Sequence, residues 1–189
     1  MGACARRWCS ALRSRCVRAL LFCAPLFLLL VGGPAEASEL SGGLSLGGMV
    51  VGAVPRFAVS PHVGMSWRRE SGFLFAFHDL CSILPTTKRL GVGVYNQTSA
   101  AIGYASEKFN LSAGPSISVY SMDACGATLC GPVVGLAPGG HAQVNVYFAG
   151  RLGVSVRANV DWVGGQSLVL PGGVAAMLVA GPVLRWGFE

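Results

Sequence analysis

The segment LGVSVRANVDW, from Leu152 to Trp162, alternates without exception between apolar residues and residues that are polar or glycine. Side chains along a β-strand point alternately to opposite faces, so this segment predicts a strand with one apolar face and one polar face. The segments FNLSAGPSISVY (109–120) and HAQVNVYF (141–148) repeat the pattern. The chain therefore contains a sheet whose two surfaces differ sharply in polarity.

Composition indicates which surface faces inward. The 189 residues are 52% hydrophobic and only 12% charged, and 27 of them are glycine. That is too little charge to cover an ordinary soluble domain. A lipocalin-like soluble barrel would turn its apolar face inward and carry charges outside, whereas a membrane barrel has a polar interior and an apolar outer face. We therefore expect an all-β fold, an eight-stranded antiparallel transmembrane β-barrel.

Eight strands fit the sequence after residue 37, and an even number allows the sheet to close with every strand antiparallel to its neighbours. They are expected at about 44–52, 57–68, 72–80, 91–105, 109–121, 141–149, 152–163 and 174–187. Most reach the ~9–11 residues that a tilted strand needs to cross a bilayer. Pro61, Pro115 and Pro182 fall inside these strands and predict bulges or kinks, because proline removes a ladder donor.

The connections between these strands separate by length. Short turns are expected at 69–71, 107–108 and 150–151, and longer loops at 81–90, 122–140 and 164–173. Short turns at one end and long loops at the other are typical of outer-membrane barrels, with the turns on the periplasmic side. Because they are long, the loops at 122–140 and, to a lesser extent, 164–173 are expected to make any surface interaction.

The N-terminus predicts export. Five arginines precede an apolar run from Ala19 to Val31, and Ala35-Glu36-Ala37 has the small-x-small pattern of a signal-peptidase site. Residues 1–37 are therefore expected to be a cleaved signal peptide and 38–189 the barrel domain. The apolar run is shorter than the ~20 residues of a spanning helix, which disfavours an uncleaved anchor. The mature chain would keep nine basic and seven acidic residues, a net charge of +2, so its basicity is no nucleic-acid footprint.

Three cysteines remain after the signal peptide, and two of them are close in sequence. Cys125 and Cys130 have a spacing compatible with a disulfide loop in an oxidising compartment, which would leave Cys81 as the odd cysteine. The disulfide is favoured over a metal site because no well-spaced fourth ligand is present. We expect neither a metal nor a cofactor.

Polar residues that face inward are expected to fill the lumen, since an eight-stranded barrel is just wide enough for side chains. If a three-residue turn centres on Arg151, His141 lies opposite Asp161 and Asn145 lies opposite Arg157. Arg157 and Asp161 are about 13 Å apart along their strand, too far for a direct ion pair. The expected interior network comprises His141, Asn145, Arg157, Asn159 and Asp161.

Aromatic residues near strand ends predict contact with the lipid headgroup level, where amphipathic rings are favoured. The residues assigned to this interface are Trp67, Trp162, Trp186 and Phe188.

The alternating pattern over 38–189 and the C-terminal sequence GPVLRWGFE resemble the small OmpA-type and OmpX-type eight-stranded barrels of Gram-negative bacteria. Trp186 and Phe188 stand two apart as in the terminal strand signal of that group, although Glu189 follows Phe188. The resemblance implies delivery by the barrel-assembly machinery to the outer membrane, among its lipid and lipopolysaccharide. It implies no particular activity.

Three functions remain open at this level. The favoured hypothesis is a non-catalytic structural or surface-interaction barrel whose ligand is unknown. The alternatives are a barrel enzyme that modifies lipid A or phospholipid and a periplasmic lipocalin-like binder. Histidine with serine or aspartate would signal the enzyme, but His62, His78 and His141 show no Ser-His-acid spacing, and catalysis requires a nucleophile and base within hydrogen-bond reach.

Overall fold

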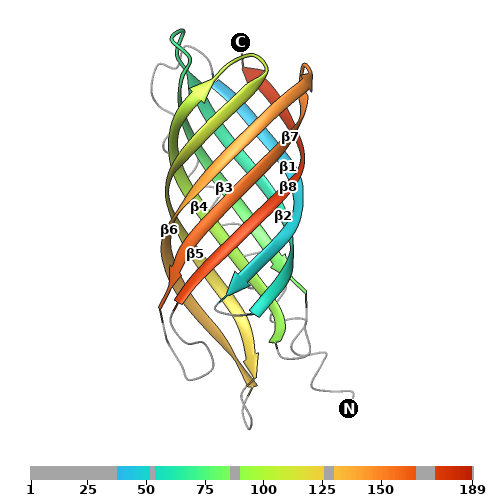
Figure 1. The fold of residues 1–189 in the computed structure, drawn as a ribbon, viewed down its shortest axis with the longest axis vertical. Helices are drawn as coiled ribbons and strands as arrows, with labels where there is room; N and C mark the ends of the chain where they lie inside the picture. Colours follow the sequence, from blue (N-terminus) through green and yellow to red (C-terminus); the bar gives the residue numbers. More distant parts are fainter. Residues whose placement is uncertain (1–37, 52–53, 86–89, 126–129, 165–172, 189) are drawn as a thin grey trace. The chain divides into compact units, whose positions relative to one another are not determined.

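Eight antiparallel strands hydrogen-bond in chain order, and the last strand pairs with the first, so the sheet closes into a barrel (Figure 1). The computed structural model describes residues 38–51, 54–85, 90–125, 130–164 and 173–188. The strands are β1 (Ser38–Val51), β2 (Val54–Arg68), β3 (Phe73–Leu84), β4 (Leu90–Ala105), β5 (Phe109–Cys125), β6 (Cys130–Ala149), β7 (Leu152–Val163) and β8 (Gly173–Phe188). The predicted fold class is confirmed. Within these residues no helix has the length and apolar character needed to cross a membrane. The expected signal peptide, 1–37, lies outside the described residues.

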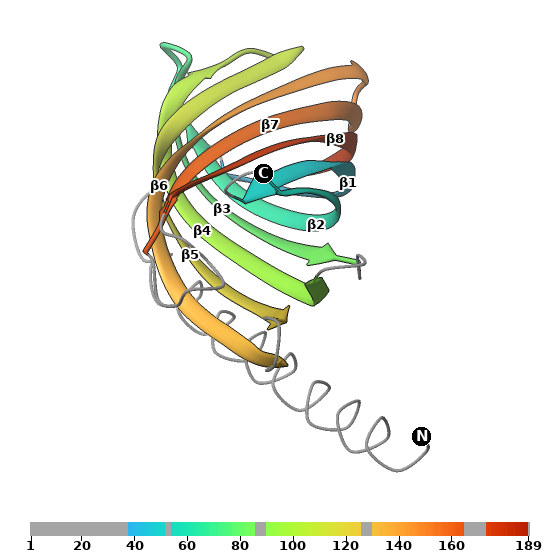
Figure 2. The same ribbon diagram turned by 60° about the horizontal axis from the view of Figure 1, so that its bottom comes forward.

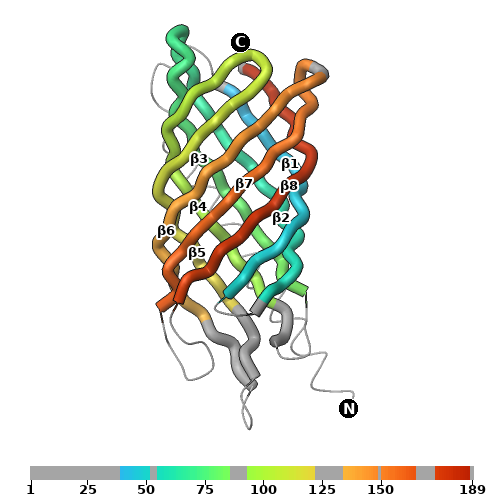
Figure 3. Tube along the Cα trace, viewed as in Figure 1, coloured from blue at the N-terminus to red at the C-terminus, as the bar shows by residue number. Residues whose placement is uncertain are grey.

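Apolar side chains cover most of the outer face of the strands, and most of the polar side chains point inward. Along β7 exposed and buried residues alternate at every position, with Val156 and Val160 exposed and Arg157 and Asp161 buried. Isoleucine, leucine, valine and phenylalanine side chains cover the outside of all eight strands. The strands run side by side around the barrel and are tilted relative to its long axis (Figures 2 and 3). A lipocalin-like interior would be apolar, and this barrel has the opposite arrangement.

The barrel has a turn end and a loop end. Connections between β2 and β3, β4 and β5, and β6 and β7 are tight and lie at the same end as the C-terminus (Figure 1). In the first of these turns the Gly72 amide donates to the Arg69 carbonyl at 2.9 Å, and Gly72 has a φ of 84°, which favours glycine. The expected periplasmic side corresponds to this turn end.

The predicted loop at 122–140 is wrong. β5 continues to Cys125 and β6 begins at Cys130, and the two strands stay in register up to that pair. Glycine and proline at 131–140 signal a loop in the sequence, but in the structure they pair with β5 along the whole stretch. β6 therefore has 20 residues and β5 has 17, against 12 in β3 and β7. β3 also runs to Leu84, so the expected loop at 81–90 is shorter than predicted.

The register predicted between the sixth and seventh strands is wrong by two residues. His141 pairs with Asn159, and Gln143, not Asn145, pairs with Arg157. The reason is a register shift between Tyr147 and Ala149, next to the turn. The prediction assumes a three-residue turn, whereas the structure has a shorter turn and an additional, unpaired residue at the end of β6. The parity of the prediction holds, so the same side chains face inward.

Bulges or kinks are predicted at Pro61, Pro115 and Pro182, and the register shows no bulge at any of them, while the kinks stay a prediction. Pairing of β2 with β3 passes from Val59↔Ile83 to His62↔Leu80 across Pro61 with no change of register. The ladders next to Pro115 and Pro182 behave in the same way. Each proline therefore costs a local stretch of pairing with one neighbour while the ladders on either side keep the same register.

Candidate functional site in the lumen

A buried carboxylate organises the polar side chains of the lumen. The Asp161 side chain on β7 accepts hydrogen bonds from the Ser116 hydroxyl at 2.9 Å, the Ser118 hydroxyl at 3.3 Å and the Gln97 amide at 3.0 Å. The Tyr95 hydroxyl also donates to it. An ionised carboxylate offers about four acceptor sites, so this set of donors from β4 and β5 fits the charged form.

A buried guanidinium forms the other half of the network. Arg157 is 2% exposed, and its Nη2 atom donates to the Gln97 side-chain oxygen at 2.7 Å and to the Ser99 hydroxyl at 3.0 Å. Its Nε atom donates to Asn159 at 3.1 Å. Gln143 lies at 3.5 Å from Nη1. Side chains from three strands, β4, β6 and β7, therefore hold one charge.

Gln97 joins the two charges. Its NH₂ group faces the Asp161 carboxylate and its oxygen faces Arg157, which is the one amide orientation that satisfies both. A bridging amide replaces the direct ion pair, in agreement with the strand separation expected from the sequence. Gln97 is not among the predicted network residues, because it lies 60 residues from Arg157 and 64 from Asp161 in the chain and meets them only when the barrel closes.

The other two predicted network members, Asn145 and His141, lie on β6 and contact other side chains of the lumen. Asn145 accepts a hydrogen bond from the Gln143 amide at 2.9 Å. The His141 ring lies 5.6 Å from the His78 ring, centroid to centroid, in an edge-on arrangement. Both histidines are 5% exposed. The structure thus brings Asn159 and Arg157 into direct contact and places His141 beside a different histidine.

Two serines lie near histidines, which bears on the catalytic alternative. The Ser45 hydroxyl is 3.4 Å from Nδ1 of His62. The Ser112 hydroxyl is 3.5 Å from Nε2 of His78. This separation is at the outer limit of a hydrogen bond, and both side chains are buried inside the lumen, away from the lipid-facing wall. Among the described residues no three metal-ligating side chains cluster as a metal site would require. These serine and histidine side chains belong to the polar interior of the lumen.

An apolar layer closes the lumen toward the loop end. Twelve buried side chains from all eight strands form one cluster there, including Tyr95, whose hydroxyl donates to Asp161. Its members are Met49, Val51, Ala58, Leu80, Leu84, Tyr95, Tyr120, Ala137, Val163, Ala175, Met177 and Val179. The sequence predicted a lumen filled by polar side chains, and the structure shows that apolar side chains fill the part nearest the loops.

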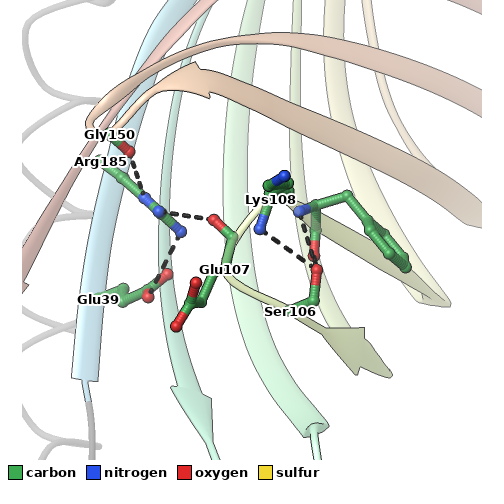
Figure 4. Close-up of polar contacts among 7 residues, drawn as sticks. Glu39, Ser106, Glu107, Lys108, Gly150 and Arg185 are labelled. Atoms are coloured by element: carbon green, nitrogen blue, oxygen red, sulfur yellow. Dashed lines mark hydrogen bonds and ion pairs between the residues drawn. The ribbon is translucent and has the colours of Figure 1, made fainter.

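Arg185 ties strands together at the turn end (Figure 4). Its guanidinium donates to the Gly150 carbonyl at 2.9 Å and to the Glu107 carbonyl at 2.7 Å, and it lies 3.9 Å from the Glu39 carboxylate. The guanidinium carbon also lies 4.2 Å above the Tyr147 ring. One side chain of β8 therefore connects two turns and the first strand across this mouth of the barrel.

The predicted interface aromatics lie on the outer surface. Trp162 near the loop end is 61% exposed, and Trp186 near the turn end is 41% exposed. Trp67 packs against Phe75 at a centroid distance of 5.8 Å. The side chain of Phe188 and those of Cys125 and Cys130 lie outside the described residues, although the two cysteines pair across β5 and β6. The assignment of these aromatics to the headgroup level and the disulfide stay predictions.

Comparison with solved structures bears on the fold. Neisserial surface protein A matches with a TM-score of 0.55 at 11% sequence identity, over 80% of this chain and 99% of that one. Ail, the attachment invasion locus protein of Yersinia pestis, matches in its complex with sucrose octasulfate with a TM-score of 0.54 at 8% identity, over 79% and 98%. The N-terminal barrel of Pseudomonas aeruginosa OprF matches with a TM-score of 0.52 at 8% identity, over 80% and 98%.

The chain has the fold of the small eight-stranded outer-membrane barrels. The predicted resemblance to this group is confirmed at the level of fold. No family model matches the sequence, and no curated protein matches it. At identities near 10% the likeness carries no specific activity across.

Proposed function

We propose that this protein is a non-catalytic barrel of the bacterial outer membrane that acts as a structural or surface-interaction protein. The observation that carries the proposal is the combination of an apolar outer wall with a lumen filled from end to end by its own side chains. The Asp161–Gln97–Arg157 network, the apolar layer above it and the Arg185 contacts below it leave no described route for solute.

The extended β5–β6 hairpin is the part proposed to act at the surface. These two strands reach farther at the loop end than the others (Figure 1). A pair of hydrogen-bonded strands that continues past the barrel rim gives a more rigid projection than a long loop. Two proteins that share this fold are named for surface or attachment roles, which is consistent with the proposal.

Membrane placement is tested by fractionation and gel migration. The exported protein should require detergent for extraction from the outer-membrane fraction, and its migration should change on heating, as for a folded barrel. Recovery in the soluble periplasmic fraction without detergent would contradict the placement.

The closed lumen is tested by conductance in planar bilayers. The purified protein should add no steady ion current, and Gln97→Ala should leave it closed because the apolar layer persists. A stable open current in the unaltered protein would contradict a filled lumen. Unchanged lipid A and phospholipid profiles on expression are also expected, and a change abolished by His78→Ala would favour the enzymatic alternative.

The surface role is tested on the hairpin itself. Replacing 122–133 by an Asn-Gly turn links the paired residues Ser121 and Val134, shortens β5 and β6 toward the length of their neighbours and should leave a heat-modifiable barrel. Any adhesion or ligand binding shown by cells that express the full chain should then fall. Binding that survives this deletion would assign the surface role elsewhere.

A further inference from the structure

The apolar outer wall is interrupted at one place by a cluster of polar side chains. Asp79 and Cys81 on β3 pair with Thr98 and Asn96 on β4, and all four face outward and are half-buried. We call these four residues the polar wall patch. Among outward-facing positions of the strands whose side chains the structure describes, only Ser121 on β5, toward the loop end, is also polar.

The patch lies well inside the lipid-facing band. Asp79 is six residues from Phe73 at the turn end of β3, which is about 20 Å along the strand at ~3.3 Å per residue. With a strand tilt near 40° this is about 15 Å along the barrel axis, within an apolar band that is typically about 25 Å tall. Phe75 and Phe77 lie on its turn side and Ile83 on its loop side. Headgroups are therefore too distant to solvate it.

Three of the four side chains interact across the two strands. The Thr98 hydroxyl donates to the Asp79 carboxylate at 3.1 Å, and Asn96 also interacts with that carboxylate. A carboxylate has about four acceptor sites, and a charge at mid-depth on a lipid-facing wall is destabilising. The two local donors offset only part of this cost, so further donors from outside the barrel would stabilise the patch.

We infer that the polar wall patch is the centre of a lateral interface between two copies of this chain. Two copies inserted in the same direction are related by a two-fold axis along the membrane normal, which makes the interface isologous. Such an axis between β3 and β4 exchanges the two strands, so Asp79 of one copy faces Thr98 of the second copy, and Cys81 faces Asn96. Each Asp79 carboxylate then faces the hydrogen-bond donors on β4 of the second copy and not the second carboxylate.

The surroundings of the patch fit the same geometry. Val63 flanks Asp79 on β2, and Ile117 and Val119 flank Thr98 and Asn96 on β5. These three apolar side chains are exposed and can pack against their counterparts. Interfaces between soluble proteins usually have an apolar centre and a polar rim. Here the centre is polar and the rim is apolar, as expected where the surrounding solvent is hydrocarbon. The inference rests on the membrane placement proposed above.

Photo-crosslinking in isolated outer membranes tests the interface. Benzoylphenylalanine, which reacts with C–H bonds in hydrocarbon, is placed at Ile117 on the rim of the patch and, as a control, at Val156 on the far wall. Irradiation should give a band of twice the monomer mass for position 117 and at least fivefold less for position 156. Asp79→Val combined with Thr98→Val should reduce the band at least fivefold while the barrel stays heat-modifiable.

Several results would overturn the interface. The interface is refuted if position 117 gives no band of twice the monomer mass, or if position 156 gives an equal band. It is also refuted if the crosslinked band has another mass, which identifies a different partner, or if the valine pair leaves the band unchanged. If the valine pair does not reach the membrane, Thr98→Val alone should lower the band at least twofold. A heat-modifiable outer-membrane protein without the crosslink refutes only the pairing, whereas recovery in the soluble fraction refutes the membrane placement itself.

Discussion

Replacing Gln97 by leucine tests whether one amide holds the two buried charges of the lumen. The side chain accepts from Arg157 at 2.7 Å and donates to Asp161 at 3.0 Å, and both bonds involve an ionised partner. Hydrogen bonds to charged groups contribute roughly 1.5–3 kcal/mol each, so losing two costs about 3–6 kcal/mol. Burial of the leucine recovers ~1 kcal/mol. The expected net loss is about 2–5 kcal/mol of unfolding free energy, taking both principles together.

Gln143→Leu is the matched control, because Gln143 is also a buried lumen glutamine. It donates to the neutral Asn145 side chain at 2.9 Å and contacts Arg157 only at 3.5 Å. Neutral hydrogen bonds contribute about 1 kcal/mol, so after the gain from leucine the expected loss is about 0–1 kcal/mol.

The assay is equilibrium urea unfolding of the refolded barrel in lipid vesicles, followed by tryptophan fluorescence. Trp67, Trp162 and Trp186 lie in the wall and report on its transfer out of the lipid. The reasoning predicts that Gln97→Leu is less stable than Gln143→Leu by about 2 kcal/mol or more. Equal losses in the two variants would refute the claim that Gln97 links the charges.

Other substitutions give distinct outcomes. Arg185→Ala removes two carbonyl contacts and the stacking on Tyr147 and should lower the unfolding free energy by about 1–2 kcal/mol in the same urea assay; an unchanged midpoint would show that these contacts contribute nothing. Val156→Lys places a charge on the outer wall in mid-strand and should cost about 2–4 kcal/mol, against about 1 kcal/mol or less for Leu152→Lys at the turn end; equal costs would argue against a lipid-facing wall. Asp161→Ala should destabilise the barrel by at least about 3 kcal/mol because Arg157 loses its balancing charge, and Arg157→Met in the same background should restore part of that loss, measured by a double-mutant cycle.

The alternation of apolar and polar residues predicts which side chains of a strand face outward, because it depends only on neighbouring residues in the sequence. β7 was placed at 152–163 from its pattern, and the structure has it there. The β5–β6 extension was missed since glycines and prolines at 131–140 resemble a loop, and only pairing with β5 shows that they continue the strand. The irregularity after Tyr147 has no sequence signature, so the register shift of two residues could not be foreseen.

The candidate site was predicted only in part for the same reason. The alternation correctly turned Arg157, Asn159 and Asp161 inward, but their partners come from strands distant in the chain. Asn96 and Thr98 are polar residues at outward positions of β4, and only the pairing of β3 with β4 places them beside Asp79 and Cys81. Which residues of different strands meet is set by barrel closure and shear, which local pattern does not specify.

The central claim is that the even-numbered side chains of β7 face hydrocarbon and the odd-numbered ones are enclosed. Single cysteines at 154, 155, 156, 158 and 160, each carrying a nitroxide, measure this by electron paramagnetic resonance in vesicles. Residues 154, 156, 158 and 160 should be relaxed strongly by oxygen dissolved in the lipid and weakly by a water-soluble nickel complex, and residue 155 should be immobilised and shielded from both. Strong nickel access at the even positions, with 155 open to oxygen, would contradict the account.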